Sequence, residues 1–479
     1  CLLLTRISPR VFGRVHALLR LWGLQDESEV AQRMEQFLAE AERDDLRELW
    51  SIIRRLIRQS DPAGAMSDAL RLSVPQHRVA LADYLLGAPQ HPTDMRRAFD
   101  VHSQLADEDS EAERLLMRAR LAVAEEQWDD VLTATNELLD HREYNLQAVC
   151  LRSLALAMTG DHINAEAALK HVRYDRNAPW FMRGRAALVS VSVAAARVGA
   201  GSAITPSAPS LTICHGRPLA QSLWVGPSLR WIEQLSMRSF LLNGWRYKLY
   251  VYDEPKNVPD GVELADATAI MPRDSVFREG STSGAHRGSL GAFSDLFRYA
   301  LLARRGGFWT DTDVINLELF EPENSRFIAS EWTDAGLIGP NGAQMAAPPN
   351  DPLQRSALAI AEELLDEPGM HFARIGPDLL AELLAQGGRE NFNLLPPNFL
   401  NPIGWMQTGR LLDRYDAVCN SQNWAGAYNI HVYTETWRLI GLGLDRSPPQ
   451  SSFLATLHER IAEACEPEPN FVRKLLQTV

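Results

Sequence analysis

The sequence predicts an all-α domain over residues 1–200 followed by an α/β domain over residues 211–479. Up to Val198, apolar residues recur every three or four positions and Ala and Leu are abundant, which indicates helices. The small, uncharged, Pro-containing stretch Gly199–Ser210 indicates a linker, placed at residues 201–210. Beyond it, short strand patterns alternate with helical ones, which favours a largely parallel sheet.

The helical half contains a repeat. Four positions of one helix pattern recur 34 residues later: Trp128, Val131, Thr135 and Leu138 correspond to His162, Ala165, Leu169 and Val172. This period is that of the tetratricopeptide repeat, which the half resembles over residues 112–179. A plain helical bundle with an accidental match is the alternative. Either architecture offers a docking surface for a protein partner.

Individual elements of the α/β half follow from local pattern. Ala220–Val225 and Tyr247–Tyr252 are short apolar or alternating runs typical of strands, and Leu229–Leu242 between them has helical periodicity. Later helices are predicted at Pro352–Asp366 and Pro377–Gln386, each with Pro in its first turn.

Composition excludes several classes of protein. The chain has 479 residues, with 48 Lys+Arg against 61 Asp+Glu, a net charge of −13. An acidic chain argues against nucleic acid as a partner, because phosphate backbones need a basic surface. Five cysteines without CxxC spacing argue against a zinc ribbon or a disulfide framework. We therefore expect a cytoplasmic protein, with membrane association through a local patch left open.

The stretch Ser294–Asp313 (SDLFRYALLARRGGFWTDTD) carries the most information. Ser294 suits an N-cap, and the glycines at 306 and 307 suit the end of a helix over Asp295–Arg305. The next residues, Phe308–Thr310, favour a strand. That strand would bring Asp311 and Asp313 to the edge where open α/β sheets bind ligands.

These residues suit the binding of an activated sugar. Alternation along a strand would point Asp311 and Asp313 to one side, toward a hard cation such as Mg²⁺ or Mn²⁺. Asp295 and Arg298 share one helical face and could bind neighbouring hydroxyls. An Asp-x-Asp pair alone is more typical of a surface turn, as we expect at Asp107–Asp109. The fixed order of helix, glycines and strand favours the site.

With these residues in view, Ser294–Asp313 resembles the DXD-containing region of bacterial and fungal glycosyltransferases of the capsular-polysaccharide and α-1,6-mannosyltransferase-like class. It is similar also to the glucosylating domains of large clostridial toxins. The resemblance extends over residues 219–442 and includes three further segments: Gln221–Gly226, Ile375–Pro377 and Asn429–Trp437. It departs at Tyr433, where the family has Trp.

The resemblance implies a GT-A fold, a UDP- or GDP-sugar donor with UDP favoured, and a Mn²⁺ or Mg²⁺ ion. Asp313 would hold the metal, Asp311 the ribose, sugar and metal, and Asp295 with Arg298 the donor hexose. His431 would be a further metal ligand or a diphosphate contact. The alternative for His431 is a satisfied histidine at a strand end.

Four further residues are predicted to bind substrate. Trp224 and Gly226 end the strand that lies beside the base in the family, although Trp224 could equally be a core residue. Gly307 adjoins the acidic pair. Arg287 belongs to the Gly- and Ser-rich stretch Ser281–Gly291, which we expect either to close over the donor, with Arg287 at the diphosphate, or to be an ordinary solvated connection.

The function predicted is hexose transfer to a glycan, lipid or protein acceptor. The resemblance implies retention by front-face attack, with the departing diphosphate as acceptor of the proton. Two alternatives stay open: a metal-dependent phosphodiesterase, and a helical-repeat scaffold that carries an inactive transferase domain.

Overall fold

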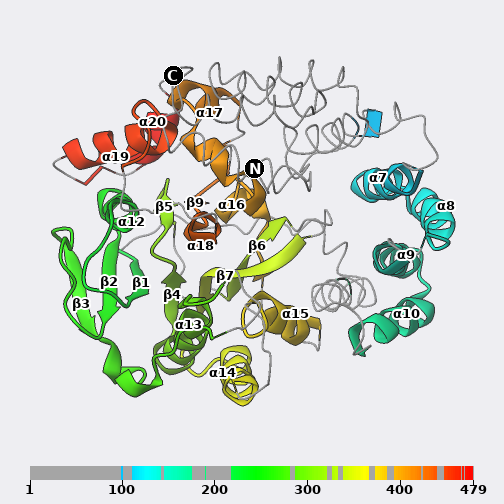
Figure 1. The fold of residues 1–479 in the computed structure, drawn as a ribbon, viewed down its shortest axis with the longest axis horizontal. Helices are drawn as coiled ribbons and strands as arrows, with labels where there is room; N and C mark the ends of the chain where they lie inside the picture. The colour runs from blue at the N-terminus through cyan, green and yellow to red at the C-terminus, as the bar shows by residue number, and fades with distance from the viewer. Residues whose placement is uncertain are drawn as a thin grey trace, which may run out of the picture.

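A computed structural model describes residues 111–141, 145–174, 217–280, 286–320, 326–332, 338–365, 373–385, 393–421, 426–439, 447–464 and 470–477, with isolated positions between these ranges. Figure 1 shows a stack of helices from the first half and, apart from them, a twisted sheet flanked by helices. The predicted linker at residues 201–210 lies outside the described residues, so the domain boundaries stay a prediction.

The described helices of the first half are α7 (Glu111–Ala124), α8 (Trp128–Leu138), α9 (Asn145–Met158) and α10 (His162–Tyr174). Successive helices pack on one another around Val131, Leu154 and Leu169. The first residues of α7 and α9 are 34 positions apart, as are those of α8 and α10. The structure nevertheless does not support a tetratricopeptide-like domain over residues 1–200, because most of that range lies outside the described residues.

The α/β half contains a seven-stranded sheet in the order β3-β2-β1-β4-β7-β6-β8. Its strands are β1 (Leu219–Trp224), β2 (Arg246–Val251), β3 (Val262–Asp266), β4 (Gly307–Thr310), β6 (Phe327–Trp332), β7 (Ile338–Ala347) and β8 (Asn393–Leu394). The strands predicted at 220–225, 247–252 and 308–310 are confirmed as β1, β2 and β4.

The sheet is largely parallel, as predicted, and β7 is the antiparallel strand among its seven strands. Strands β3, β2, β1 and β4 are parallel, and β6 and β8 run in the same direction, whereas β7 is antiparallel to both β4 and β6. Helices α12 (Trp231–Leu242) and α13 (Gly291–Arg305) provide the crossovers from β1 to β2 and from β3 to β4, whereas residues 252–261 join β2 to β3 without a helix. The chain between β6 and β7 is too short for such a crossover, so these two strands form an antiparallel pair.

Residues on β4 alternate between two cores. Phe308 packs with Phe240 of α12 on one face of the sheet. Trp309 packs with Phe297 of α13 on the opposite face, where α14 (Pro352–Leu364) and α15 (Pro377–Ala385) also lie. Figure 1 shows α13, α14 and α15 grouped together below the sheet. The strand is thereby fixed at both faces just before Asp311.

A second, two-stranded sheet pairs β5 (Val314–Asn316) with β9 (Asn429–His431) in antiparallel register, Val314 opposite His431. Trp437 is fully buried in the core beside this sheet. The remaining elements of this half are the 3-10 helices η3 (Ala267–Ala269), η4 (Arg273–Ser275) and η6 (Trp405–Leu412), and the helices α16 (Pro397–Leu400), α17 (Tyr415–Ser421), α18 (Thr434–Leu439), α19 (Phe453–Glu463) and α20 (Phe471–Gln477).

Helix α13 begins one turn before the predicted start, so Ser294 is not its N-cap. The N–H of Ser294 donates within the helix to the carbonyl of Leu290 at 2.8 Å. The early start is stabilised by the hydroxyl of Ser289, which accepts the N–H of Gly291 at 3.0 Å. The end is as predicted, with Gly306 and Gly307 both at positive φ.

None of the described helices combines the length and the apolar character that a bilayer span requires.

Candidate active site

Asp311 follows the last residue of β4. Its backbone N–H donates to the carbonyl of Ala343 on β7 at 2.8 Å, which keeps the chain attached to the neighbouring strand beyond the end of β4. Its carboxylate accepts a hydrogen bond from the indole Nε1 of Trp309 at 2.8 Å. The sheet therefore fixes both the backbone and the side chain of this residue.

Arg298 of α13 joins two carboxylates. Its guanidinium lies 3.1 Å from the Asp295 carboxylate and 3.1 Å from the Asp311 carboxylate. It also lies over the ring of Trp309, with 5.4 Å from Cζ to the ring centroid, a favourable cation–π geometry. Helical spacing places Asp295 and Arg298 on one face, as predicted. One buried cation thus connects this pair to the Asp-x-Asp sequence.

Burial governs the protonation of this cluster. Burial of Asp295 raises its pKa to about 6, with Arg298 opposing the shift and Asp311 adding to it. The pKa of Asp311 is also raised by burial, against the opposing effect of Arg298. For Arg298, burial lowers the pKa, but the two carboxylates outweigh it and the net pKa is raised. The guanidinium therefore stays charged and stabilises the ionised carboxylates.

Asp313 is held by the start of α18. Its Oδ2 accepts hydrogen bonds from the backbone N–H and from the hydroxyl of Thr434, both at 2.8 Å. Its Oδ1 lies 3.4 Å from Nε2 of His431, and its carbonyl accepts the N–H of Val432 at 3.0 Å. Burial raises the pKa of Asp313, but the His431 and Thr434 interactions outweigh burial and the net pKa is lowered. This carboxylate is ionised.

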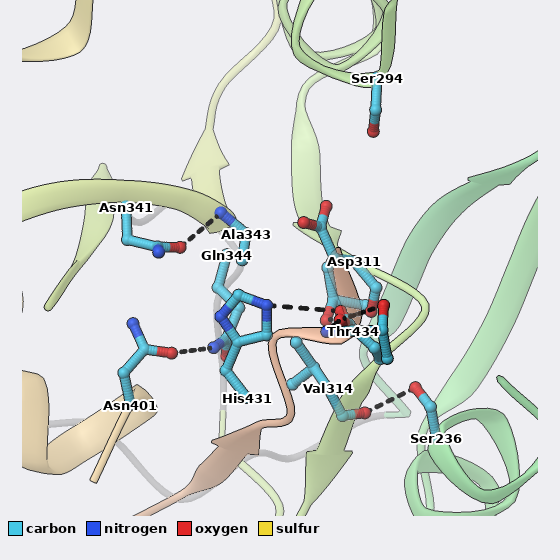
Figure 2. A network of polar contacts seen from close by, with 12 residues as sticks. Ser236, Ser294, Asp311, Val314, Asn341, Ala343, Gln344, Asn401, His431 and Thr434 are labelled. Carbon is cyan, nitrogen blue, oxygen red and sulfur yellow. Dashed lines mark hydrogen bonds and ion pairs between the residues drawn. The ribbon is translucent and has the colours of Figure 1, made fainter. Parts of the chain in front are cut away.

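The two aspartates do not alternate along a strand, as the sequence pattern suggests. Asp313 lies in the turn between β4 and β5, and the two carboxylates face different partners. In Figure 2, Asp311 points toward Ser294 of α13, whereas His431 and Thr434 lie on the other side of the network. The turn, rather than the pleat of a strand, brings both side chains to one site.

A chain of buried amides ties the small sheet to the large one. The amide of Asn316 donates to the side-chain oxygen of Asn429 at 2.7 Å, and Asn429 donates to Gln344 of β7. Gln344 donates in turn to the side chain of Asn401 at 3.3 Å and to the carbonyl of Leu400 at 3.1 Å. Figure 2 shows Gln344 and Asn401 beside His431. This network sets the position of β9, and so of His431, relative to β7.

Asp311, Asp313 and His431 fit a divalent cation. Each offers one ligand atom, and these atoms all lie within 4.8 Å of one another. Carboxylate oxygens are the ligands that Mg²⁺ and Mn²⁺ prefer, and an imidazole is compatible with Mn²⁺. Nδ1 of His431 is buried without a hydrogen-bond partner among the described residues, so this ring is not the fully satisfied histidine of the alternative interpretation.

Two glycines allow backbone to approach the Asp295–Arg298 pair. A Cβ on Gly376, just before α15, would lie 2.5 Å from Oδ2 of Asp295. A Cβ on Gly342 of β7 would lie 2.4 Å from a terminal nitrogen of Arg298. Side chains at these positions would displace the two groups, so the glycines shape the space around the pair.

Three of the predicted substrate-binding residues lie on β1 or beside it. Trp224, at the end of β1, is partly exposed, and the guanidinium of Arg230 lies over its ring at 5.6 Å from the centroid. A Cβ on Gly226 would lie 3.1 Å from Nε1 of Trp224. Gly307 has φ +96°, and a Cβ there would lie 2.6 Å from Gln221, so it serves close strand packing.

Part of the predicted closing stretch is described. Residues 281–285 lie outside the described residues; Arg287 is exposed, and its carbonyl accepts a hydrogen bond from Arg438 of α18 at 3.4 Å. His286 Nδ1 lies 3.0 Å from the carboxylate of Glu435, on the same helix. The segment after 285 is therefore attached to the helix whose first residue, Thr434, binds Asp313.

Several residues of this site are not among the predicted site residues. Thr434, Glu331 and Asn341 carry no prediction, although each contacts the candidate metal site or its neighbours, and Tyr433 is predicted only as a departure from the family. The ring of Tyr433 stacks on His431 with 3.7 Å between centroids, at a backbone φ of +55°. A Thr at the start of a short helix, as Thr434 is in α18, is the one local signal that favours a cap. Glu331 and Asn341 carry no such signal, because only the pairing of β6 with β7 brings them here.

Comparisons with known proteins gave few matches. No protein-family model matches the chain, and no curated protein matches it. Among solved structures, the chain is similar to one titled "PaToxG Glycosyltransferase", with 15% sequence identity and a TM-score of 0.27. The match covers 50% of this chain and 87% of that one. At such a score we base the function on the site itself.

Proposed function

We propose that this protein is a metal-dependent glycosyltransferase that moves a hexose from a nucleotide-sugar, with UDP favoured as the nucleotide. The observation that carries the proposal is that Arg298 contacts both Asp295 and Asp311. A pair suited to sugar hydroxyls and a triad suited to a divalent cation therefore form one continuous site. A nucleotide-sugar carries both kinds of group, because its hexose hydroxyls lie next to its diphosphate.

Each charged residue has a proposed task. Asp311, Asp313 and His431 would hold Mn²⁺ or Mg²⁺, which supplies positive charge to a diphosphate leaving group when bound. Asp295 would accept hydrogen bonds from hexose hydroxyls, and Arg298 would donate to them. Thr434 keeps the Asp313 carboxylate ionised and oriented by its two hydrogen bonds.

The predicted substrate contacts at β1 and in the closing stretch remain proposals. Trp224 is partly exposed and could stack with the base, with Gly226 beside it. Arg287 is exposed and free to approach the diphosphate from the segment attached to α18. For Gly307 the packing role described above is sufficient, although it adjoins the site. Retention by front-face attack is proposed on the family resemblance.

The helical half is proposed to dock the acceptor or a protein partner, as a domain over residues 1–200 ahead of the transferase domain at 211–479. The acceptor is a glycan, lipid or protein, and a cytoplasmic location is proposed from cysteine usage alone. A phosphodiesterase is less favoured, because such sites usually hold two ions and, within the described residues, a single ligand triad is found.

Donor screening tests the proposed function. The full chain is incubated with UDP- and GDP-sugars in the presence of Mn²⁺, and nucleotide release is measured. We expect release from one donor, abolished by excess chelator. Release from no donor, or release that is unaffected by the chelator, would contradict the proposal.

A further inference from the structure

Glu331, near the end of β6, is a carboxylate beside the metal-binding triad but outside it. We propose that Glu331 binds the hydroxyl group of the acceptor, an inference that rests on the proposed function. Its ligand is thus an alcohol, whether of a sugar or of an amino-acid side chain. Four features support this assignment: its two connections to the triad, its side of the sheet, its fixed orientation and its exposure.

The first connection runs along β7. The side-chain amide of Asn341 donates to Oε2 of Glu331 at 2.8 Å, and the side-chain oxygen of Asn341 accepts the N–H of Ala343 at 2.8 Å. The carbonyl of Ala343 accepts the N–H of Asp311. Figure 2 shows Asn341 and Ala343 joined beside Asp311. Three hydrogen bonds therefore separate Glu331 from the first aspartate.

The second connection runs through an aromatic ring. Tyr433 lies within electrostatic reach of the Glu331 carboxylate, while its hydroxyl has no hydrogen-bond partner among the described residues, and its ring stacks on His431 with 3.7 Å between centroids. Glu331 therefore lies on the side of His431 that carries Tyr433.

The side of the sheet separates Glu331 from the donor. Ligands of open α/β sheets bind at the carboxyl ends of the parallel strands, here β1, β2, β3 and β4. The proposed hexose pair, Asp295 and Arg298, belongs to α13, which lies between β3 and β4 in the sequence. Glu331 instead lies on β6, separated from β4 by β7. Glu331 thus comes from the β7–β6–β8 side of the sheet, whereas the proposed hexose pair comes from the helix that precedes β4.

Orientation and exposure suit the binding of a hydroxyl. Asn341 holds one oxygen of Glu331, so the carboxylate is fixed before a ligand arrives. Glu331 is partly exposed, whereas Asn341 is buried. A partly exposed carboxylate with one oxygen already engaged offers the other oxygen as a hydrogen-bond acceptor, and an acceptor alcohol supplies the matching O–H donor.

Glu331→Gln is the decisive variant. The single amide oxygen of Gln has to accept the hydrogen bond of Asn341, which leaves an NH₂ group toward the ligand and reverses the polarity there. Shape and the Asn341 contact are kept. Glu263→Gln on β3, at the opposite edge of the same sheet, is the matched control, because Glu263 pairs with Arg246 and lies far from β6.

Three quantities are measured for the full chain with Mn²⁺. Calorimetry gives the affinity for UDP, a nucleotide-release assay gives kcat with water as acceptor, and product analysis in glycerol gives the ratio of glyceryl glycoside to free hexose. We expect Glu331→Gln to bind UDP within twofold of the wild type and to lose at least tenfold in kcat or in the glyceryl product ratio. Methyl glucoside and N-acetylserine amide, used in place of glycerol, distinguish a sugar hydroxyl from a side-chain hydroxyl.

Two outcomes would overturn the inference. If kcat and the product ratio are unchanged, Glu331 does not contact the acceptor. If the affinity for UDP and Mn²⁺ falls as much as kcat, Glu331 acts only on the triad through Tyr433. Failure of the proposed function has a different signature, because the wild type itself would then release no nucleotide from any donor.

Discussion

Thr434 gives Asp313 two hydrogen bonds, from its N–H and from its hydroxyl, across 121 positions of sequence. Both go to Oδ2 and leave Oδ1 toward His431. A short helix thus supplies its first donors to a carboxylate of the candidate metal site rather than to its own cap. The arrangement orients Asp313 before a cation binds and couples the site to the position of α18.

Asp313→Asn is expected to abolish metal-dependent activity while the protein stays folded. The Asn oxygen can accept both Thr434 bonds, so the contact with α18 survives, but an NH₂ group then faces the metal. Nucleotide release should fall roughly 100-fold or more, since metal-ion charge stabilisation is worth several kcal/mol. Circular dichroism and thermal melting report the fold. An Asp313→Asn protein that retains wild-type, chelator-sensitive release would refute the metal assignment.

Asp295→Asn is expected to separate sugar binding from nucleotide binding. Loss of a hydrogen bond to a charged group costs about 1.5–3 kcal/mol, so affinity for the nucleotide-sugar should fall at least tenfold. Affinity for the free nucleoside diphosphate should hardly change, because Asp295 contacts Arg298 and is not a member of the metal triad. Calorimetry with both ligands measures this. Equal losses for the two ligands would count against a hexose role.

Arg298→Ala is expected to weaken the binding of both the sugar and the nucleotide, so it does not separate the two. The structure shows that Arg298 also compensates Asp311. Breaking a buried ion pair typically costs about 3–5 kcal/mol, and here two carboxylates lose their partner. We therefore expect this variant to melt at a lower temperature and to bind both UDP–Mn²⁺ and the nucleotide-sugar more weakly. A variant with wild-type melting would show that the ion pairs contribute little.

Gly376→Ala is expected to reduce sugar binding without unfolding the protein. The new Cβ would lie 2.5 Å from Oδ2 of Asp295, which Arg298 prevents from moving freely. Gly404→Ala is the matched control, because a Cβ there meets nothing within 4 Å. Affinity for the nucleotide-sugar should fall only in the first variant. If both variants bind the donor normally, the Asp295 carboxylate is not held as described.

Much of the sheet from β3 to β4 could be predicted from local pattern, whereas the strands β7, β6 and β8 could not. Periodicity, glycines and strand propensity predict the elements β1, α12, β2, α13 and β4. The joining of Glu331 to Asn341 depends on strand pairing between β6 and β7, with a register shift between Ile328 and Ala329. No motif encodes such a pairing. For the same reason, the sequence does not predict the buried amides around Gln344.

At the site, the family resemblance predicted a contact that local sequence patterns could not. It implied that His431 lies beside Asp313, although the two residues are more than 100 positions apart. It did not indicate that Arg298 would pair with Asp311, because that contact depends on the distance between α13 and the end of β4. The residue type of Ser294 predicts a cap, but the N-cap of α13 is Leu290. The Ser289 contact with Gly291 instead starts the helix one turn earlier.

Glu279→Gln is expected to flatten the pH dependence of stability. Burial raises the pKa of Glu279 from 4.5 to about 7; His286 opposes this shift, whereas Glu435 and Asp295 add to it. The folded state therefore binds this proton more tightly than the unfolded state, so wild-type stability falls as the pH rises from 4.5 through 7. The variant should melt higher than the wild type at pH 8 and equally at pH 4.5. Glu254→Gln in an exposed turn is the control, and a variant gain that is equal at both pH values would contradict the burial argument.

A fragment that begins near Ser210 is expected to fold and to release nucleotide from the donor. Within the described residues, the apolar clusters of the α/β half contain only residues from Ala220 onward, and helices α7–α10 pack around Leu154 in a cluster of their own. The described clusters of the two halves therefore share no residue. Circular dichroism, thermal melting and the nucleotide-release assay test this directly. A soluble, folded fragment without donor hydrolysis would show that the first half contributes to the catalytic site.

The same fragment tests the docking role of the helices. Binding energy from parts of the acceptor far from the reacting atoms can raise transfer when it positions the hydroxyl. We therefore expect the full chain to exceed the fragment in transfer to the native acceptor, and to equal it in hydrolysis with water. The ratio of transfer to hydrolysis, measured for both proteins at equal concentration, isolates the contribution of the helices. If the folded fragment transfers to the native acceptor as efficiently as the full chain, the helices do not dock it.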